Sequence, residues 1–279
     1  MASVAFRTES GKRPAYSDER DVRVSLEAQA REEATKVKEL AEDIGGQFDA
    51  EALAYHRAYV SSGLAESSRV LLDELASRGL KEKRLLDLGS GVGSFSFEAL
   101  KRGAGSTVGI DLSPEMVSLA SRLSVKLGMG ERADFTVGNA ATTDLPASEI
   151  VILDRVLCCY PERADLLRNS ARASTEFVAF VVPRNEGLLR ILGMPIMAVF
   201  NFLSRSRGEK AYHLPDIAAL DRTLTAEGFS RIFKRASGTW LAYIYEKQAL
   251  NIPAVPPRPA GCRHGGVFTP TGGPVPGGW

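Results

Sequence analysis

A short apolar run followed by alternating glycines, RLLDLGSGVGSFSFEAL at residues 84–100, constrains the fold of this chain more than any other stretch. RLLDL predicts a buried strand, and SFSFEAL predicts a helix that begins directly after the glycines. Gly89, Gly91 and Gly93 permit positive φ and let the backbone approach a bulky ligand without a Cβ clash. The start of the helix offers unpaired N–H groups and a positive dipole end. We therefore expect a strand–turn–helix unit with a ligand site at its turn.

Strands and helices alternate beyond this turn. Alternation of strands with helices of about 10–15 residues predicts βαβ units and a parallel sheet covered on both faces. Further strands are predicted at residues 106–110, 133–137, 149–154 and 176–183, and helices at about 93–102, 113–128, 161–173, 186–205 and 214–227. Ser113 is the expected N-cap of its helix, with Pro114 at the first helical position. Residues 230–237 and 239–247 follow as an expected antiparallel pair.

The two ends of the chain differ from this middle part. Residues 1–16 are polar and aperiodic and are expected to be disordered, and residues 17–79 predict a helical cap. Within it, one helix is expected to stop at Gly45-Gly46 and a second to run from about residue 49 to 77. Residues 249–279 hold seven of the 14 prolines and seven of the 26 glycines, which predicts a disordered tail.

Composition excludes several classes of protein. Lys and Arg (35) nearly balance Asp and Glu (34), so no overall charge attracts nucleic acid or an anionic membrane. Three cysteines do not build a disulfide framework and fit a reducing compartment. No signal peptide is recognisable, and the most apolar stretch, 187–203, is interrupted by Arg190, Gly193 and Pro195. We expect a soluble, cytoplasmic protein without stable membrane insertion and without a metal site.

Acidic residues at the predicted strand ends indicate which class of ligand the site can bind. The pattern D-x-G-x-G-x-G carries Asp87 on the strand itself, unlike the dinucleotide pattern G-x-G-x-x-G. An acid there disfavours a pyrophosphate and suits a cationic ammonium group. Asp111 ends the next strand, where a carboxylate can accept both hydroxyls of a ribose. Asn139 and Ala140 follow the third strand, near the expected position of an adenine.

D-x-G-x-G-x-G, GIDLSP and GNA together resemble the class I S-adenosylmethionine-dependent methyltransferases over residues 80–248. The resemblance implies a Rossmann-like, doubly wound α/β fold whose seven-stranded sheet has its last strand antiparallel. It also implies S-adenosyl-L-methionine as cofactor and S-adenosyl-L-homocysteine as product. The cofactor-binding positions that it implies are Asp87, Gly89, Ser90, Gly91, Gly93, Asp111, Leu112, Asn139, Ala140 and Asp154. A doubly wound domain that binds NAD or no nucleotide is the alternative.

A narrower similarity links residues 180–217 to the magnesium-protoporphyrin IX O-methyltransferases, in a strand ending in proline, an apolar helix and a basic stretch. That family carries His-Tyr-Pro after its fourth strand, whereas this chain has Cys159-Tyr160-Pro161. On extended backbone Cys158 and Cys159 would point in opposite directions and form no convergent metal pair. We therefore interpret Cys158 as a core residue and Cys159 as part of a pocket wall.

Three residues are candidates for catalysis. His213 in AYHLPD is a candidate base, and Tyr59 is a candidate on the helix that would close over the methyl group. Tyr160 is placed to bond substrate or cofactor. Two of them have a purely structural alternative: a helix-adjacent hydrogen bond for His213 and core packing for Tyr160. The pair Asp154–Arg155 has one as well, an ion pair.

The predicted activity is methyl transfer by in-line displacement to a small or medium, largely apolar acceptor, with O-methylation of a carboxylate or hydroxyl favoured. The apolar helix predicted at 186–203 would line a cavity for such an acceptor. Core packing or a homodimer contact explains it equally, and interfacial membrane contact is a third alternative, since basic residues follow the helix. Two other classes stay open: an RNA or protein methyltransferase, and a cofactor-binding scaffold without chemistry. The near-zero net charge disfavours nucleic acid.

Overall fold

The structure, a computed structural model, describes residues 19–160, 163–185 and 214–248. The predictions for residues 1–16, for the apolar helix at 186–203, for His213 and for the tail at 249–279 lie outside these ranges. No helix in the described ranges is long and apolar enough to cross a membrane.

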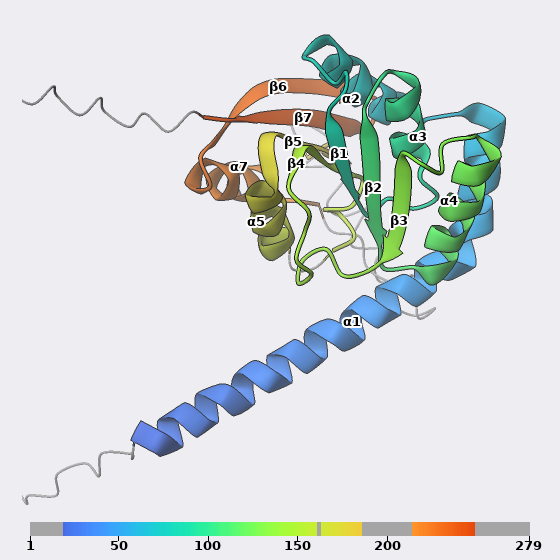
Figure 1. Cartoon of the computed structure of the whole chain (residues 1–279). Coiled ribbons are helices and arrows are strands. Elements are labelled where there is room, and N and C mark those ends of the chain that lie inside the picture. The colour runs from blue at the N-terminus through green and yellow to red at the C-terminus, as the bar shows by residue number, and fades with distance from the viewer. Residues whose placement is uncertain (1–18, 161–162, 186–213, 249–279) are drawn as a thin grey trace, which may run out of the picture. The chain divides into compact units, whose positions relative to one another are not determined.

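One sheet of seven strands organises the described chain, in the order β3-β2-β1-β4-β5-β7-β6 (Figure 1). The strands are β1 (Arg84–Leu88), β2 (Ser106–Asp111), β3 (Ala133–Val137), β4 (Ser148–Asp154), β5 (Ser174–Pro183), β6 (Phe229–Ser237) and β7 (Trp240–Lys247). The first five strands pair in parallel, and β7 pairs antiparallel with both β5 and β6. The predicted fold class is confirmed, including the antiparallel last strand.

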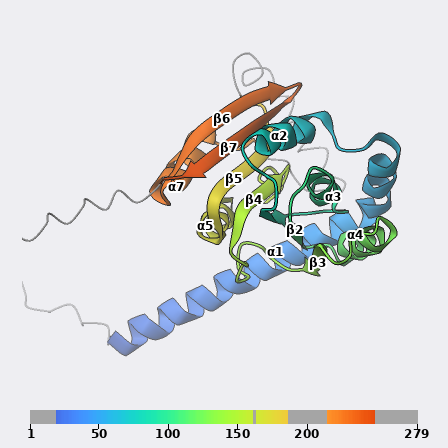
Figure 2. The ribbon, with the colours of Figure 1, turned by 45° about the horizontal axis from the view of Figure 1, so that its top comes forward.

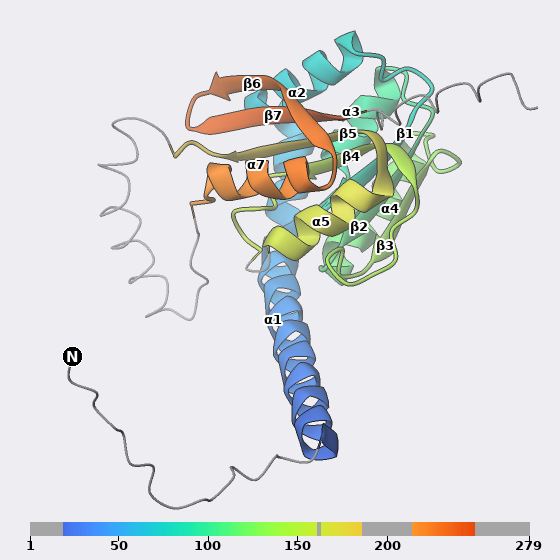
Figure 3. The same cartoon turned by 90° about the vertical axis from the view of Figure 1, so that its left-hand side faces the viewer.

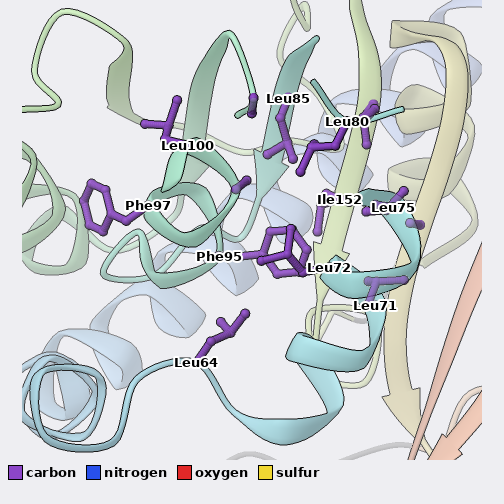
Figure 4. Close-up of a cluster of buried hydrophobic side chains, with 14 of the residues drawn as sticks. Leu64, Leu71, Leu72, Leu75, Leu80, Leu85, Phe95, Phe97, Leu100 and Ile152 are labelled. Atoms are coloured by element: carbon purple, nitrogen blue, oxygen red, sulfur yellow. The ribbon is translucent and has the colours of Figure 1, made fainter. Parts of the chain in front are cut away.

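Helices cover both faces of this sheet, as parallel strands require. The described helices are α1 (Glu19–Ser62), α2 (Glu66–Ser77), α3 (Ser94–Lys101), α4 (Pro114–Lys126), α5 (Arg163–Ala173) and α7 (Ile217–Ala226). Helices α2, α3 and α4 lie on one face of the sheet, and α5 and α7 lie on the other (Figures 2 and 3). Apolar side chains form a buried cluster on each face, the first with α2, α3 and α4 and the second with α5 and α7. Figure 4 shows Leu72 of α2 and Phe95 of α3 within the first cluster, together with Leu85 and Ile152 from the sheet.

The pattern of burial explains why the central strands are almost continuously apolar. In β5, residues 177–182 are all buried, because side chains on alternate sides meet helices on both faces. Val178 and Phe180 face the α5 and α7 cluster, and Ala179 and Val181 face the α2, α3 and α4 cluster. The core therefore fixes the sheet and leaves its carboxyl edge for the loops.

The helix break predicted at Gly45-Gly46 is wrong, because α1 continues through both glycines to Ser62. A Cβ on Gly45 would lie 2.7 Å from the carbonyl oxygen of Leu112, so the glycine lets the helix contact the loop after β2. The chain turns instead at Gly63, which has a φ of 71° and donates its N–H to the Tyr59 carbonyl at 2.8 Å.

The start of α4 is confirmed and has a second cap that local sequence did not reveal. Ser113 Oγ accepts the N–H of Met116 at 3.0 Å, as expected of an N-cap. The same hydroxyl donates to Asp49 of α1, which also accepts the N–H of Glu115 at 3.1 Å. Asp49 therefore joins α1 to the edge of the sheet where β2 ends.

Candidate active site

A cavity of about 530 Å³ opens at the carboxyl ends of β1, β2 and β4. Parallel strands of a doubly wound sheet bind ligands at this edge. Parts of α1 and α2 form the opposite wall. Eight predicted cofactor residues line the cavity: Asp87, Gly89, Ser90, Gly91, Asp111, Leu112, Ala140 and Asp154. Gly93 and Asn139 are not among its lining residues.

The three glycines of the turn do different things. A Cβ on Gly89 would lie 2.4 Å from Cγ2 of Val156, and a Cβ on Gly93 would lie 2.7 Å from the ring of Phe135. At Gly91 the nearest atom would be 4.0 Å away, so its missing side chain leaves space in the cavity. All three have positive φ, between 54° and 79°. Gly93, which we expected beside the cofactor, therefore serves packing behind the turn.

Asp111 holds the glycine turn against β2. Its Oδ2 accepts the N–H of Gly91 at 2.7 Å, and its Oδ1 accepts the N–H of Ser113 at 2.9 Å. Burial raises the pKa of this carboxyl, and the backbone N–H groups act in the opposite direction. Asp111 thus fixes the loops after β1 and β2 while its carboxylate lines the cavity.

Two more buried acids, Asp87 and Asp154, form with Asp111 an acidic edge of the cavity. Asp87 Oδ2 accepts the hydroxyl of Ser96 at 2.8 Å, and burial, with Asp154 and Asp111 nearby, raises the pKa of Asp87 to about 7. Burial also raises the pKa of Asp154, against the effect of the Ser68 hydroxyl and of Arg155. Asp154 Oδ1 is buried without a hydrogen-bond partner in the described ranges. Three carboxyls that form no ion pair within the described residues suit a ligand that brings positive charge.

The raised pKa of Asp87 gives a prediction for the ligand-free protein. Because the folded pKa of about 7 exceeds the ordinary value of 3.8, the folded state retains a proton that the unfolded chain loses. The contribution of Asp87 to stability is therefore full below pH 4 and is lost as pH rises through 7. Between pH 5 and 8 the free energy of unfolding should fall by about 2–3 kcal/mol more in wild type than in Asp87→Asn. Urea unfolding at both pH values measures it; equal pH slopes for the two proteins would contradict it.

Tyr160 and Asn139 form a pair beside the cavity. The Tyr160 hydroxyl donates to Asn139 Oδ1 at 2.7 Å, and the N–H of Ala141 donates to the same oxygen at 3.0 Å. The side-chain oxygen of Asn139, a residue that we expected near the adenine, therefore already accepts two hydrogen bonds. Tyr160 is buried and lines the cavity, with its proton directed to Asn139. The structure thus brings these two predicted residues together.

Tyr59 also lines the cavity, but its hydroxyl is directed to α3. The hydroxyl donates to Glu98 Oε1 at 3.0 Å and accepts a hydrogen bond from Lys101 Nζ at 3.4 Å. Burial and the charge of Glu98 raise the pKa of Tyr59 to about 12, which makes its phenolate a rare species at neutral pH. Tyr55, one helical turn earlier, lines the cavity as well and is 47% exposed.

The expected geometry of the cysteine pair is wrong. Residues 157–159 form a turn, in which Cys159 N–H donates to the Val156 carbonyl at 2.9 Å, rather than extended backbone. The turn brings the two Sγ atoms to 3.4 Å from each other. Cys158 is buried and Cys159 lines the cavity, as we predicted. The described ranges contain no cluster of three or more His, Cys, Asp or Glu side chains placed to hold a metal ion.

Sequence reasoning missed the wall contributed by the helical cap. The apolar side chains of this wall are Ile44, Phe48 and Leu64, and the cavity also has Val92, Met116 and Leu166 from outside the cap in its lining. It also missed the two arginines of the lining, Arg69 and Arg155. Asp154–Arg155 had an ion pair as its simple interpretation, yet neither residue forms an ion pair within the described ranges. No local pattern could have identified these residues, since tertiary packing alone places α1 and α2 over the strand ends.

Comparisons with known proteins match part of the chain to methyltransferases. A family model described as "Methyltransferase domain" matches residues 80–191. Ribosomal protein L11 methyltransferase of Haemophilus influenzae (strain PittEE) is 30% identical over 90 residues, 32% of this chain and 30% of its own length. Ajmaline N-methyltransferase of Rauvolfia serpentina is 24% identical over 142 residues, 44% of this chain and 49% of that protein. The chain thus spans between about a third and a half of the length of these curated relatives.

Solved structures agree on the fold. Magnesium protoporphyrin IX methyltransferase of Synechocystis PCC 6803 with bound SAH has a TM-score of 0.59 at 19% identity, over 74% of this chain and 98% of that one. The [4+2]-cyclase SpnF has a TM-score of 0.58 at 17% identity, over 75% and 97%. With the acid–glycine–acid motifs and the sheet order, these matches identify a methyltransferase domain over residues 80–191 and show that the described chain has the fold of the class I S-adenosylmethionine-dependent methyltransferases.

Proposed function

We propose that this protein transfers the methyl group of S-adenosylmethionine to a small or medium, largely apolar acceptor, and that it methylates oxygen. One observation carries the proposal: one cavity of about 530 Å³ has an acidic edge at the strand ends and an apolar wall from α1 and the segment that joins it to α2. A cavity of this size and mixed lining is typical of a small-molecule site.

The residues present fit the cofactor. Its ammonium group would supply the donor that buried Asp154 Oδ1 lacks, and Asp87 would stabilise the same positive charge in its ionised form. Asp111 would accept ribose hydroxyls, and Gly91 leaves the space that a bulky nucleoside needs. When bound, the cofactor supplies a methyl group on a positively charged sulfur, ready for in-line displacement. The chain's contribution is to position the acceptor and to exclude water.

The lining favours a carboxylate acceptor. The described lining residues include no histidine, and the hydroxyls of Tyr59 and Tyr160 are directed to Glu98 and Asn139. A hydroxyl or carbon acceptor benefits from a base, whereas a carboxylate is already an anion and loses no proton on methylation. His213, the other candidate base, lies outside the described residues.

A panel of acceptors tests the proposal. Purified protein with S-adenosylmethionine should release S-adenosylhomocysteine with hydrophobic carboxylic acids, porphyrins with free propionates among them. It should release at least about tenfold less with the matched methyl esters, which have no free carboxylate to accept the group. Release with phenols but not with carboxylic acids would contradict the carboxylate preference, and binding of the cofactor without release on any acceptor would favour a scaffold.

A protein substrate is the second candidate, because relatives of this chain are ribosomal protein L11 methyltransferases. The match covers 32% of this chain, and such a substrate requires an open approach to the cavity. Including a recombinant ribosomal protein in the same panel distinguishes the two. The cyclase SpnF shares the fold, so the fold by itself does not determine the reaction.

A further inference from the structure

Arg155 is a cavity residue whose hydrogen bonding is incomplete. It follows Asp154 at the carboxyl end of β4 and lines the cavity. Its Nε is buried without an acceptor in the described part of the chain, and its Nη2 donates to Ser67 Oγ at 3.0 Å. Proteins rarely leave a buried donor unpaired, and a guanidinium carries five donors. An acceptor is therefore expected to reach Arg155 from the cavity when a ligand is bound.

The guanidinium is held in place before any ligand arrives. Its Cζ lies 4.8 Å from the ring centroid of Trp240, so the indole of β7 covers one face of the group. The backbone N–H of Arg155 donates to the Val181 carbonyl at 3.1 Å, which extends the β4–β5 pairing by one position. Its φ is 63°, a conformation that is uncommon for non-glycine residues and that recurs at functional sites. A fixed planar fork is suited to a carboxylate.

The charges around Arg155 favour an anionic group over a neutral one. Four acids line the same cavity, the three aspartates of the strand ends and Glu66 of α2, yet none forms an ion pair with Arg155 within the described residues. Beside it, Asp154 Oδ1 lacks a donor. A vacant acceptor next to an incompletely bonded cation is complementary to a ligand that carries both an ammonium and a carboxylate.

We propose that Arg155 is the carboxylate-binding residue of this cavity, an inference that rests on the proposed function. The carboxylate has two sources: the amino-acid end of the cofactor, whose ammonium would lie at Asp154, or an apolar acid bound as acceptor. In either case Arg155 is a binding residue that determines specificity, and the acidic edge binds the positive charge.

A thermodynamic cycle tests the first source by calorimetry. Wild type and Arg155→Met are each titrated with S-adenosylmethionine and with its decarboxylated analogue, which retains the sulfonium and the amine. The variant should bind S-adenosylmethionine about 10–100-fold more weakly than wild type and bind the analogue no more weakly. Methionine leaves the backbone strain unchanged, because both residues carry a Cβ at positive φ.

The second source has its own titration. Octanoate and octanamide are titrated into protein saturated with S-adenosylhomocysteine. If the carboxylate is the acceptor's, wild type should prefer octanoate about tenfold or more, and Arg155→Met should lose this preference. Arg84→Met is the control, since it removes an equal charge from the exposed start of β1, at the opposite end of the strand from the cavity.

The outcomes separate this inference from the proposed function. The wild-type titrations are informative by themselves, because they measure the preference for a carboxylate ligand even if Arg155→Met does not fold. If wild type binds S-adenosylmethionine but neither titration shows a carboxylate preference that depends on Arg155, the inference is overturned and the proposed function stands. If wild type binds neither S-adenosylmethionine nor S-adenosylhomocysteine, the proposed function fails.

Discussion

Replacing Asp111 by alanine is expected to weaken binding of S-adenosylmethionine by at least about 100-fold, because two hydrogen bonds from ribose hydroxyls to a buried carboxylate are lost together. The same change leaves the N–H groups of Gly91 and Ser113 without their acceptor. Each buried N–H that loses its partner costs about 1–3 kcal/mol of folding free energy. Isothermal titration gives the affinity, and thermal unfolding gives the stability separately.

Two further variants separate the loss of cofactor affinity from the loss of stability. Asp111→Asn retains one acceptor oxygen, so it should keep more stability than the alanine variant while still binding the cofactor poorly. Asp134→Ala changes an exposed acid on β3, the strand that neighbours β2, and should alter neither quantity. Affinity of Asp111→Ala within about threefold of wild type would remove Asp111 from the cofactor site.

Gly89→Ala is expected to destabilise the protein by about 2–5 kcal/mol, the largest effect on stability that the turn predicts. Two causes add. Alanine at a φ of 71° is strained by about 1–2 kcal/mol, and its Cβ would lie 2.4 Å from Val156 Cγ2, so one of the two segments must move. Urea unfolding of the variant and of wild type measures the loss.

The two causes can be separated experimentally. Gly128→Ala has nearly the same φ, 67°, with no atom within 4 Å of the added Cβ, so it should show the strain alone. Gly89→Ala combined with Val156→Ala removes the clashing methyl groups and should recover the part of the loss that exceeds the Gly128 value. A double variant as unstable as Gly89→Ala would show that Val156 is not the obstacle.

The features that sequence predicted well depend on short-range physics. The strand ending in Asp87, the turn after it and the Ser113 cap each follow from residues within a few positions of one another. The alternation of strands and helices then left few possible topologies, and the resemblance supplied the antiparallel β7.

The errors concern contacts between distant segments. Gly45-Gly46 carries the local signal of a helix end, but its function in the structure is the close approach to Leu112, which sequence does not show. Likewise, the hydrogen bond from Tyr160 to Asn139 joins residues 21 positions apart along the chain, so no local pattern predicts it. The cysteine pair was misjudged because the backbone after β4 turns one residue after a left-handed Arg155, a conformation with no marker when glycine is absent.

The contact of Asp49 with the start of α4 has a consequence for the order in which the molecule is assembled. Ser113, the partner of Asp49, lies 64 positions later in the chain. Most of α1 is therefore synthesised long before the segment that it contacts at the start of α4. Loops of this length close late relative to local turns and hairpins. The wall formed by Phe48 and Tyr55 therefore comes into place only after β1 and β2 have paired. Ligand binding therefore requires the complete site, and a nascent fragment that ends before α4 should not bind the ligand.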